Sequence, residues 1–157
     1  VMGGIEATEQ IVSRWPEACV LAVTTLDGRD TVLPMLSAGA SGYMLKDSSA
    51  DEIVSALRQA HEGTSSLSPR IAAMLVQHVR DAKPGGLAGE LEALTERESE
   101  VLNHLALGMS NAEMAEALHV SEGTVKAHLG SIMSKWHVRD RVQVLVTAAR
   151  AGLVDFT

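Results

Sequence analysis

The sequence predicts two structural classes in succession: part of a parallel α/β domain, then an all-α domain of four helices. In residues 1–80, short apolar segments of strand type alternate with helical patterns, the last of them an amphipathic helix over 68–79. The segment 81–93 contains Pro84 and three glycines, and only helical patterns follow it. Because proline and glycine interrupt regular structure, we interpret this segment as a linker.

Two strand–helix pairs make up the first part. The runs at 18–25 and 41–45 are short and apolar, as in buried strands. Helices are predicted over 27–40, with Pro34 inside the pattern, and over 49–63. Two strands do not make a stable parallel sheet, so we expect this part to be the end of a domain whose other strands are absent from the sequence.

Four helical segments make up the second part, over 95–108, 110–118, 121–136 and 140–152. The first two begin with capping boxes, in which Thr95 and Ser110 are each followed three residues later by glutamate. The short turn at 119–121 joins the second segment to the third. This arrangement makes a helix-turn-helix candidate, with its longer second helix in the position that enters the major groove.

The helix predicted over 121–136 hides its bulky residues and exposes small ones. At 100° per residue one stripe carries Val125, Leu129, Ile132, Met133 and Trp136. The opposite face carries Ala127, Gly130, Ser131 and Ser134, with Lys126 and Lys135 at its borders. Small residues allow close approach to base edges, and flanking lysines suit phosphates. They are equally typical of helix–helix contacts, so the pattern alone leaves both interpretations open.

Charge does not by itself indicate DNA. The 157 residues carry a net charge of −7, which argues against a nucleic-acid partner. Residues 121–157 are nevertheless locally basic, with five basic and three acidic residues.

Composition also limits location and chemistry. No run is apolar enough to cross a membrane and no signal pattern is present, so we expect a cytoplasmic protein. Cys19, the single cysteine, lies in an apolar run and is predicted to be a buried thiol. The six histidines show no metal-ligand spacing. A hydrolase using His104 or His128 would need converging titratable groups that the sequence does not show, so we predict no metal site and no enzyme.

The second part resembles the LuxR-type helix-turn-helix domain over essentially all of residues 93–154. The resemblance rests on many positions at fixed spacing: Leu94, Thr95, Arg97, Glu98, Gly108, Asn111, Ala115, Val120, Ser121, Thr124, Val125, Lys126, His128, Lys135, Val138 and Arg141.

The first part resembles the second half of a receiver domain, as in NarL/FixJ-type response regulators. "GGIEA" is similar to the start of the third receiver helix, and "GASGYMLKD" to the segment that carries the switch aromatic and the invariant lysine. The resemblance implies a doubly wound parallel sheet and assigns Thr24, Tyr43 and Lys46 to the phosphoryl switch. We expect the receiver half over 1–66, a linker helix and Gly/Pro linker over 67–93, and the DNA-binding domain over 94–157.

The same resemblance places the phosphoacceptor aspartate and the acidic pair that binds Mg²⁺ before Val1. Mg²⁺ is therefore expected only if the first half of the receiver is present. The chain is then either part of a longer regulator, the interpretation we favour, or a truncated product.

The resemblance implies a response-regulator transcription factor controlled by aspartyl phosphorylation. Its expected partners are double-stranded DNA with a two-fold symmetric site, a sensor histidine kinase and a second copy in a homodimer. We expect Lys126, Ala127, Gly130 and Ser131 near base edges, Asn111, Ser121, Thr124, His128 and Lys135 near phosphates, and Val142, Leu145, Val146 and Ala149 on a dimer face. Packing on the other helices is the alternative for that last face. The alternative function is a phosphorylation-independent regulator that binds DNA or another protein.

Overall fold

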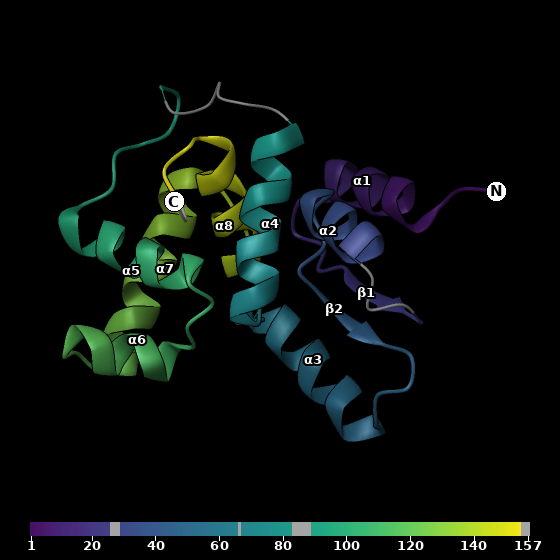
Figure 1. Ribbon diagram of the computed structural model, residues 1–157, viewed down its shortest axis with the longest axis horizontal. Coiled ribbons are helices and arrows are strands. Elements are labelled where there is room, and N and C mark those ends of the chain that lie inside the picture. Colours follow the sequence, from purple (N-terminus) through teal and green to yellow (C-terminus); the bar gives the residue numbers. More distant parts are fainter. Residues whose placement is uncertain (26–28, 66, 83–88, 155–157) are drawn as a thin grey trace.

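A computed structural model describes residues 1–25, 29–65, 67–82 and 89–154 (Figure 1). It confirms a mixed α/β part followed by four helices. In chain order the elements are α1 (Gly4–Arg14), β1 (Leu21–Thr24), α2 (Arg29–Ser37), β2 (Gly42–Leu45), α3 (Ala50–Glu62), α4 (Pro69–Ala82), α5 (Glu96–Ala106), α6 (Asn111–Leu118), α7 (Glu122–Trp136) and α8 (Arg141–Arg150).

The two strands pair in parallel, from Leu21 opposite Gly42 to Thr24 opposite Leu45. β1 is shorter than the predicted run 18–25 and less buried, with Val23 half exposed. Within the described residues β2 is its only strand partner. The prediction of a buried thiol is wrong, because Cys19 lies before β1 and is exposed.

Helix α2 follows the predicted pattern, with Pro34 inside the helix. The chain leaves the helix through Gly39, whose φ of +117° is accessible to glycine and unfavourable for other residues. α3 begins with the capping box of Ser49 and Glu52 and ends at Gly63 in the left-handed conformation, as its sequence predicts.

Helix α4 connects the two parts of the chain and also belongs to the hydrophobic core. It confirms the amphipathic helix predicted over 68–79, and its residues Ala72, Leu75, Val76 and Val79 are almost completely buried. In Figure 1, α4 stands between the N-terminal elements and helices α5, α6 and α7. The linker residues 83–88, including Pro84, lie outside the described residues, and the predicted domain boundaries stay a prediction.

The four C-terminal helices have the predicted caps and order. Thr95 and Ser110 form their capping boxes with Glu98 and Glu113, and the turn between α6 and α7 passes through His119 in the left-handed conformation. α8 is apolar on several sides and packs on α7 and α5 as well as on α4 and α2. One continuous hydrophobic core therefore joins the two parts of the chain.

The close packing depends on one glycine at the end of α5. Gly108 has a φ of +75°, and a Cβ placed there would lie 2.5 Å from Cα of Pro69, at the start of α4. Any larger residue would force these two backbones apart.

The central position of α4 predicts a large effect of a core substitution. Leu75 is fully buried, so Leu75→Ala should lower the free energy of unfolding by about 2–5 kcal/mol, measured by denaturant titration. Leu57→Ala on α3 is the matched control. Leu57 is half exposed, so this substitution should lower the free energy of unfolding much less. Equal losses for the two variants would contradict a core that is continuous through α4.

Candidate nucleic-acid interface

Helix α7 divides its residues as its sequence predicts. Val125, Leu129, Ile132 and Trp136 are buried, whereas Ala127, Gly130 and Ser134 are exposed. A Cβ built on Gly130 would meet no atom within 4 Å outside its own helix backbone. The outward face of α7 is therefore open at Ala127, Gly130 and Ser134, and Gly130 does not pack against another described helix.

The two lysines of α7 have different surroundings. Lys126 is exposed on the outward face. Lys135 instead turns back to α5, where its Nζ donates to Oε2 of Glu98 at 2.7 Å and lies 3.3 Å from the carbonyl oxygen of Ala93. Lys135, predicted near a phosphate, is thus already paired with a carboxylate, although a fifth of its side chain is exposed.

The carboxylate of Glu98 accepts hydrogen bonds from the polar groups between α5 and α7. Its carboxylate accepts from Oγ of Ser131 at 2.6 Å, from Lys135, and from the backbone amide of Thr95 at 2.8 Å. Burial alone raises the pKa of this carboxyl, but the hydrogen bonds from Lys135, Ser131 and Thr95 lower it more, to about 2. Ser131, predicted near a base edge, is therefore bonded inside the chain.

Apart from Lys135, the residues predicted near phosphates lie at the N-termini of α6 and α7 and at one border of the outward face of α7. Ser121 caps α7, accepting from the amide of Thr124 at 3.1 Å, and the two hydroxyls lie 2.9 Å apart. Asn111 is the first residue of α6, and His128 is partly exposed on α7. Helix N-termini present unpaired amides and a positive dipole end, which favour anions.

A buried arginine lies behind Asn111. Arg141 is 4% exposed, and its guanidinium donates to Oδ1 of Asn111 at 3.0 Å and to the carbonyl oxygen of Met109 at 2.8 Å. Burial lowers the pKa of this guanidinium. Its backbone amide donates to the carbonyl oxygen of Gly63 at the end of α3, so Arg141 contacts both parts of the chain.

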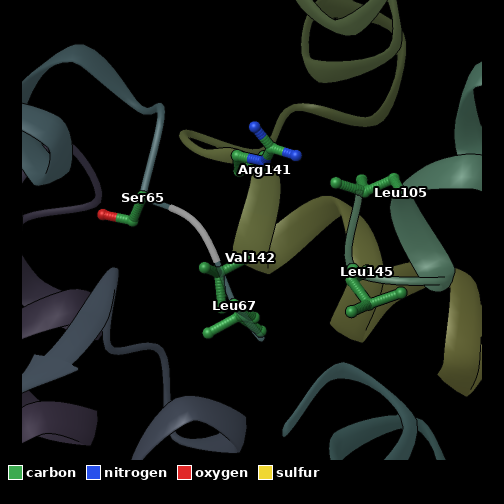
Figure 2. Close-up of a pocket in the computed structure, with 7 residues that line it drawn as sticks. Ser65, Leu67, Leu105, Arg141, Val142 and Leu145 are labelled. Carbon is green, nitrogen blue, oxygen red and sulfur yellow. The ribbon is translucent and has the colours of Figure 1, made fainter. Parts of the chain in front are cut away.

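Arg141 also borders a small cavity of about 10 Å³ at the junction of the two parts (Figure 2). Ser65 and Leu67 line it from the segment between α3 and α4, and Leu105, Val142 and Leu145 from the helical part. It has room for about one water molecule and is too small for a ligand.

Three side chains near α8 cover the C-terminal end of α2. Nη2 of Arg139 donates to the carbonyl oxygen of Gly39 at 3.0 Å and to Oγ of Ser41 at 2.7 Å. Nε2 of Gln143 donates to the carbonyl oxygens of Leu36 and Ala40, at 3.1 and 3.2 Å, and Nη2 of Arg150 donates to that of Ser37 at 3.1 Å. The last carbonyls of a helix carry partial negative charge, which Arg150 complements at Ser37, whereas Arg139 binds the turn that follows the helix.

Asp140 connects this contact to the start of α8. It is fully buried, its Oδ1 accepts from the backbone amide of Gln143 at 2.9 Å, and its Oδ2 accepts from Nε of Arg139 at 3.2 Å. One carboxylate thus caps α8 and orients Arg139 toward α2.

The predicted dimer face is occupied within the chain. Val142, Leu145, Val146 and Ala149 are each no more than 2% exposed and belong to the shared core. In this arrangement these four residues pack on other helices of the chain, which is the alternative that the sequence left open. A dimer contact through them requires α8 to leave its neighbours and stays a prediction.

The predicted switch residues lie at neighbouring strands. The amide of Lys46 donates to the carbonyl oxygen of Thr24 at 2.8 Å, which brings the carboxyl ends of β1 and β2 together. Lys46 is exposed and Thr24 partly exposed, whereas Tyr43 packs partly buried against the core. No group of three or more potential metal ligands occurs among the described residues.

Sequence reasoning assigned no role to Arg139, Gln143 and Arg150, and used Arg141 only for the resemblance. The available signal was on α8, where Gln143, Thr147 and Arg150 share a side distinct from the apolar stripe. That side predicts a polar contact, but it does not identify helix C-terminal carbonyls as the partner.

The fold and this open face define a helix-turn-helix DNA-binding protein. The luxR family of bacterial regulatory proteins matches residues 92–148. The chain is 43% identical to the transcriptional regulatory protein LnrK of Bacillus subtilis (strain 168), over 99% of this chain and 74% of LnrK. It is 37% identical to the response regulator protein VraR of Staphylococcus aureus (strain COL), over 98% of this chain and 71% of VraR.

Among solved structures, the response regulator ChrA of a heme-sensing two-component system is 35% identical, over 98% of this chain and 72% of that chain, with a TM-score of 0.39. The chain belongs to the luxR family of bacterial regulatory proteins, as a response-regulator transcription factor with a LuxR-type DNA-binding domain. In the described part of the chain, no helix has the length and apolar character needed to span a membrane.

The Glu98 network predicts a specific dependence of stability on pH. The pKa of Glu98 is about 2 in the folded chain and 4.5 ordinarily, so its stabilising contribution is complete above pH 4.5 and is lost as the pH falls toward 2. Glu98→Gln should lower the free energy of unfolding at pH 7 by about 1–3 kcal/mol. The difference from the unsubstituted chain should shrink over that acidic range.

Denaturant titrations at several pH values measure this difference. Glu96→Gln is the matched control, because Glu96 is exposed in the first turn of the same helix and should change stability by less than about 0.5 kcal/mol. A Glu98→Gln loss that stays constant down to pH 2 would contradict the assignment.

Proposed function

We propose that the outward face of α7 lies in the major groove of double-stranded DNA, with Lys126, Ala127 and Gly130 nearest the base edges. The observation that carries this is the open face of α7 at Ala127 and Gly130, opposite a stripe of bulky apolar residues that pack in or against the core. Ser121, Thr124, Asn111 and His128 would then contact phosphates on either side. Ser131 and Lys135 contribute by fixing α7 to α5 through Glu98.

We further propose that the arrangement described here is the closed form of the regulator. The outward face of α7 is open, but α8, which carries the predicted dimer face, is held against α2 and α4. A two-fold symmetric DNA site requires two copies, so holding α8 would keep the protein from binding such a site as a dimer.

Phosphorylation of the intact receiver by a sensor histidine kinase would favour the release of α8 from α2 and α4. Thr24 would donate to a phosphoryl oxygen, and Lys46 would neutralise its charge, since both lie at the carboxyl ends of the strands. Tyr43 lies one residue before the buried Met44 on the strand that follows Gly39–Ser41, the segment that Arg139 contacts. The acceptor aspartate and Mg²⁺ stay expectations about residues outside this sequence.

The position of Gly130 predicts two effects of opposite sign. Gly130→Ala should raise the free energy of unfolding by about 0.5–1 kcal/mol, because alanine favours the helix and meets open space in the chain. The same methyl group should weaken binding to a duplex selected by the unsubstituted chain from a random-sequence pool. Thermal unfolding and fluorescence anisotropy measure the two effects.

Ser134→Ala is the control for Gly130→Ala. Ser134 is also exposed on α7, but one helical turn closer to its C-terminus and not among the residues proposed to contact DNA. Unchanged affinity for Gly130→Ala, together with higher stability, would contradict close approach of this face to DNA.

The contact of α8 with α2 stabilises the closed form. Weakening this contact should favour an open form, in which α8 has left α2 and α4. Gln143→Met keeps the side chain's length but removes two hydrogen bonds to α2, which should favour opening by about 1–2 kcal/mol, or roughly tenfold. Sedimentation velocity should show more dimer, and affinity for the selected duplex should rise.

Gln77→Met is the matched control, because Gln77 is exposed and donates to Asp81 within α4. A monomeric Gln143→Met variant with unchanged DNA affinity would overturn the closed-form proposal without affecting the proposed DNA-contact residues.

A further inference from the structure

We propose that Arg141 is a positioning residue for DNA binding: it orients the side chain of Asn111 so that the amide NH₂ of Asn111 faces a DNA phosphate. This inference rests on the proposed DNA interface, in which Asn111 contacts a phosphate. It assigns Arg141 a role that does not involve touching DNA.

Arg141 is a buried cation whose two hydrogen-bond acceptors are neutral. At 4% exposure its guanidinium donates to the side-chain oxygen of Asn111 and the backbone oxygen of Met109. Burying a charge without a carboxylate partner is unfavourable, and an apolar side chain of similar size would fill this space at lower cost. Its bond to Asn111 offers a function that an apolar side chain would not supply.

The hydrogen bond from Arg141 fixes the orientation of the Asn111 amide. An arginine side chain has only donors, so the group facing Nη1 of Arg141 at 3.0 Å must be the amide oxygen. The NH₂ group of the same planar amide is therefore turned away from Arg141. An amide without such a partner would rotate between its two orientations, and only one presents donors to an anion.

Asn111 lies at the N-terminal end of α6. It is partly exposed as the first residue of α6, immediately after the cap Ser110. Ser110 and Glu113 satisfy each other through the capping box, so neither competes for the side chain of Asn111. The NH₂ group is thus available beside the amides and positive dipole end of α6, which favour a phosphate.

Arg141 is itself held in place by its neighbours. It begins α8 directly after Asp140, the fully buried cap of that helix, and its own amide donates to Gly63. A binding group is well positioned when the residue behind it is fixed by packing and further hydrogen bonds. Because Arg141 is buried behind Asn111, it cannot reach a phosphate without leaving these contacts.

The test is a double-mutant cycle on the full chain, using the duplex selected from a random pool. Asn111→Ala should weaken binding about three- to tenfold, as expected for one hydrogen bond. Arg141→Met should weaken it by a similar factor, and the double variant should bind no more weakly than Asn111→Ala alone. Arg141→Lys, which can still donate to Asn111, should recover part of the affinity.

A salt titration separates positioning from direct contact. Neither Asn111→Ala nor Arg141→Met should change the slope of log affinity against log salt, because neither removes a charge that touches DNA. A slope reduced by about one for Arg141→Met would mean that Arg141 binds a phosphate directly, which would overturn the inference.

Asn111→Asp keeps the test informative if Arg141→Met does not fold. The new carboxylate would pair with the buried guanidinium, so the melting temperature should rise, while DNA binding should fall by more than tenfold through loss of the donor and phosphate repulsion.

The remaining outcomes separate the two proposals. Unchanged affinity of Asn111→Ala would overturn the proposed phosphate contact, and the inference with it. A loss for Asn111→Ala that simply multiplies with that of Arg141→Met would overturn only the inference, because Arg141 would then act independently.

Discussion

The structure depends on the burial of α8 between the two parts of the chain. Residues on several sides of this helix are apolar, and they pack on α4 and α2 as well as on α5 and α7. Asp140 caps its start, and Arg139, Gln143 and Arg150 bond the carbonyls at the end of α2. Hydrophobic burial holds α8 in place, and the hydrogen bonds to the end of α2 and to the turn at Gly39–Ser41 fix its orientation.

The contact of α8 with α2 joins the α/β part of the chain to the helical part that carries α7. The recognition helix α7 keeps its outward face open, whereas α8 is covered. In the proposed scheme the receiver therefore controls assembly on DNA by holding α8, and leaves the reading surface itself unobstructed. The contacts with α2 are hydrogen bonds to the segment that leads into β2, so a modest change in that segment would be enough to weaken them.

Glu98 bonds two residues that the sequence predicted near DNA. Sequence reasoning placed Ser131 and Lys135 at DNA, because they lie on or beside the small-residue face of α7. The structure bonds both to a buried carboxylate on α5, which fixes the angle of α7. A helix wheel assigns residues to faces but does not show which neighbouring helix carries a partner, so residues that bond to another helix and residues that stay exposed look alike in sequence.

What the sequence by itself determined is local. Capping residues, glycines and hydrophobic spacing are short-range signals, and they predicted the helices from α2 to α8, the turn at His119 and the buried stripe of α7. Only the tertiary structure decided that α4 joins both parts in one core, that Cys19 is exposed, and that Arg141 lies behind Asn111. These facts depend on contacts between residues far apart in the chain, and such contacts arise from the packing of whole elements, which no local pattern records.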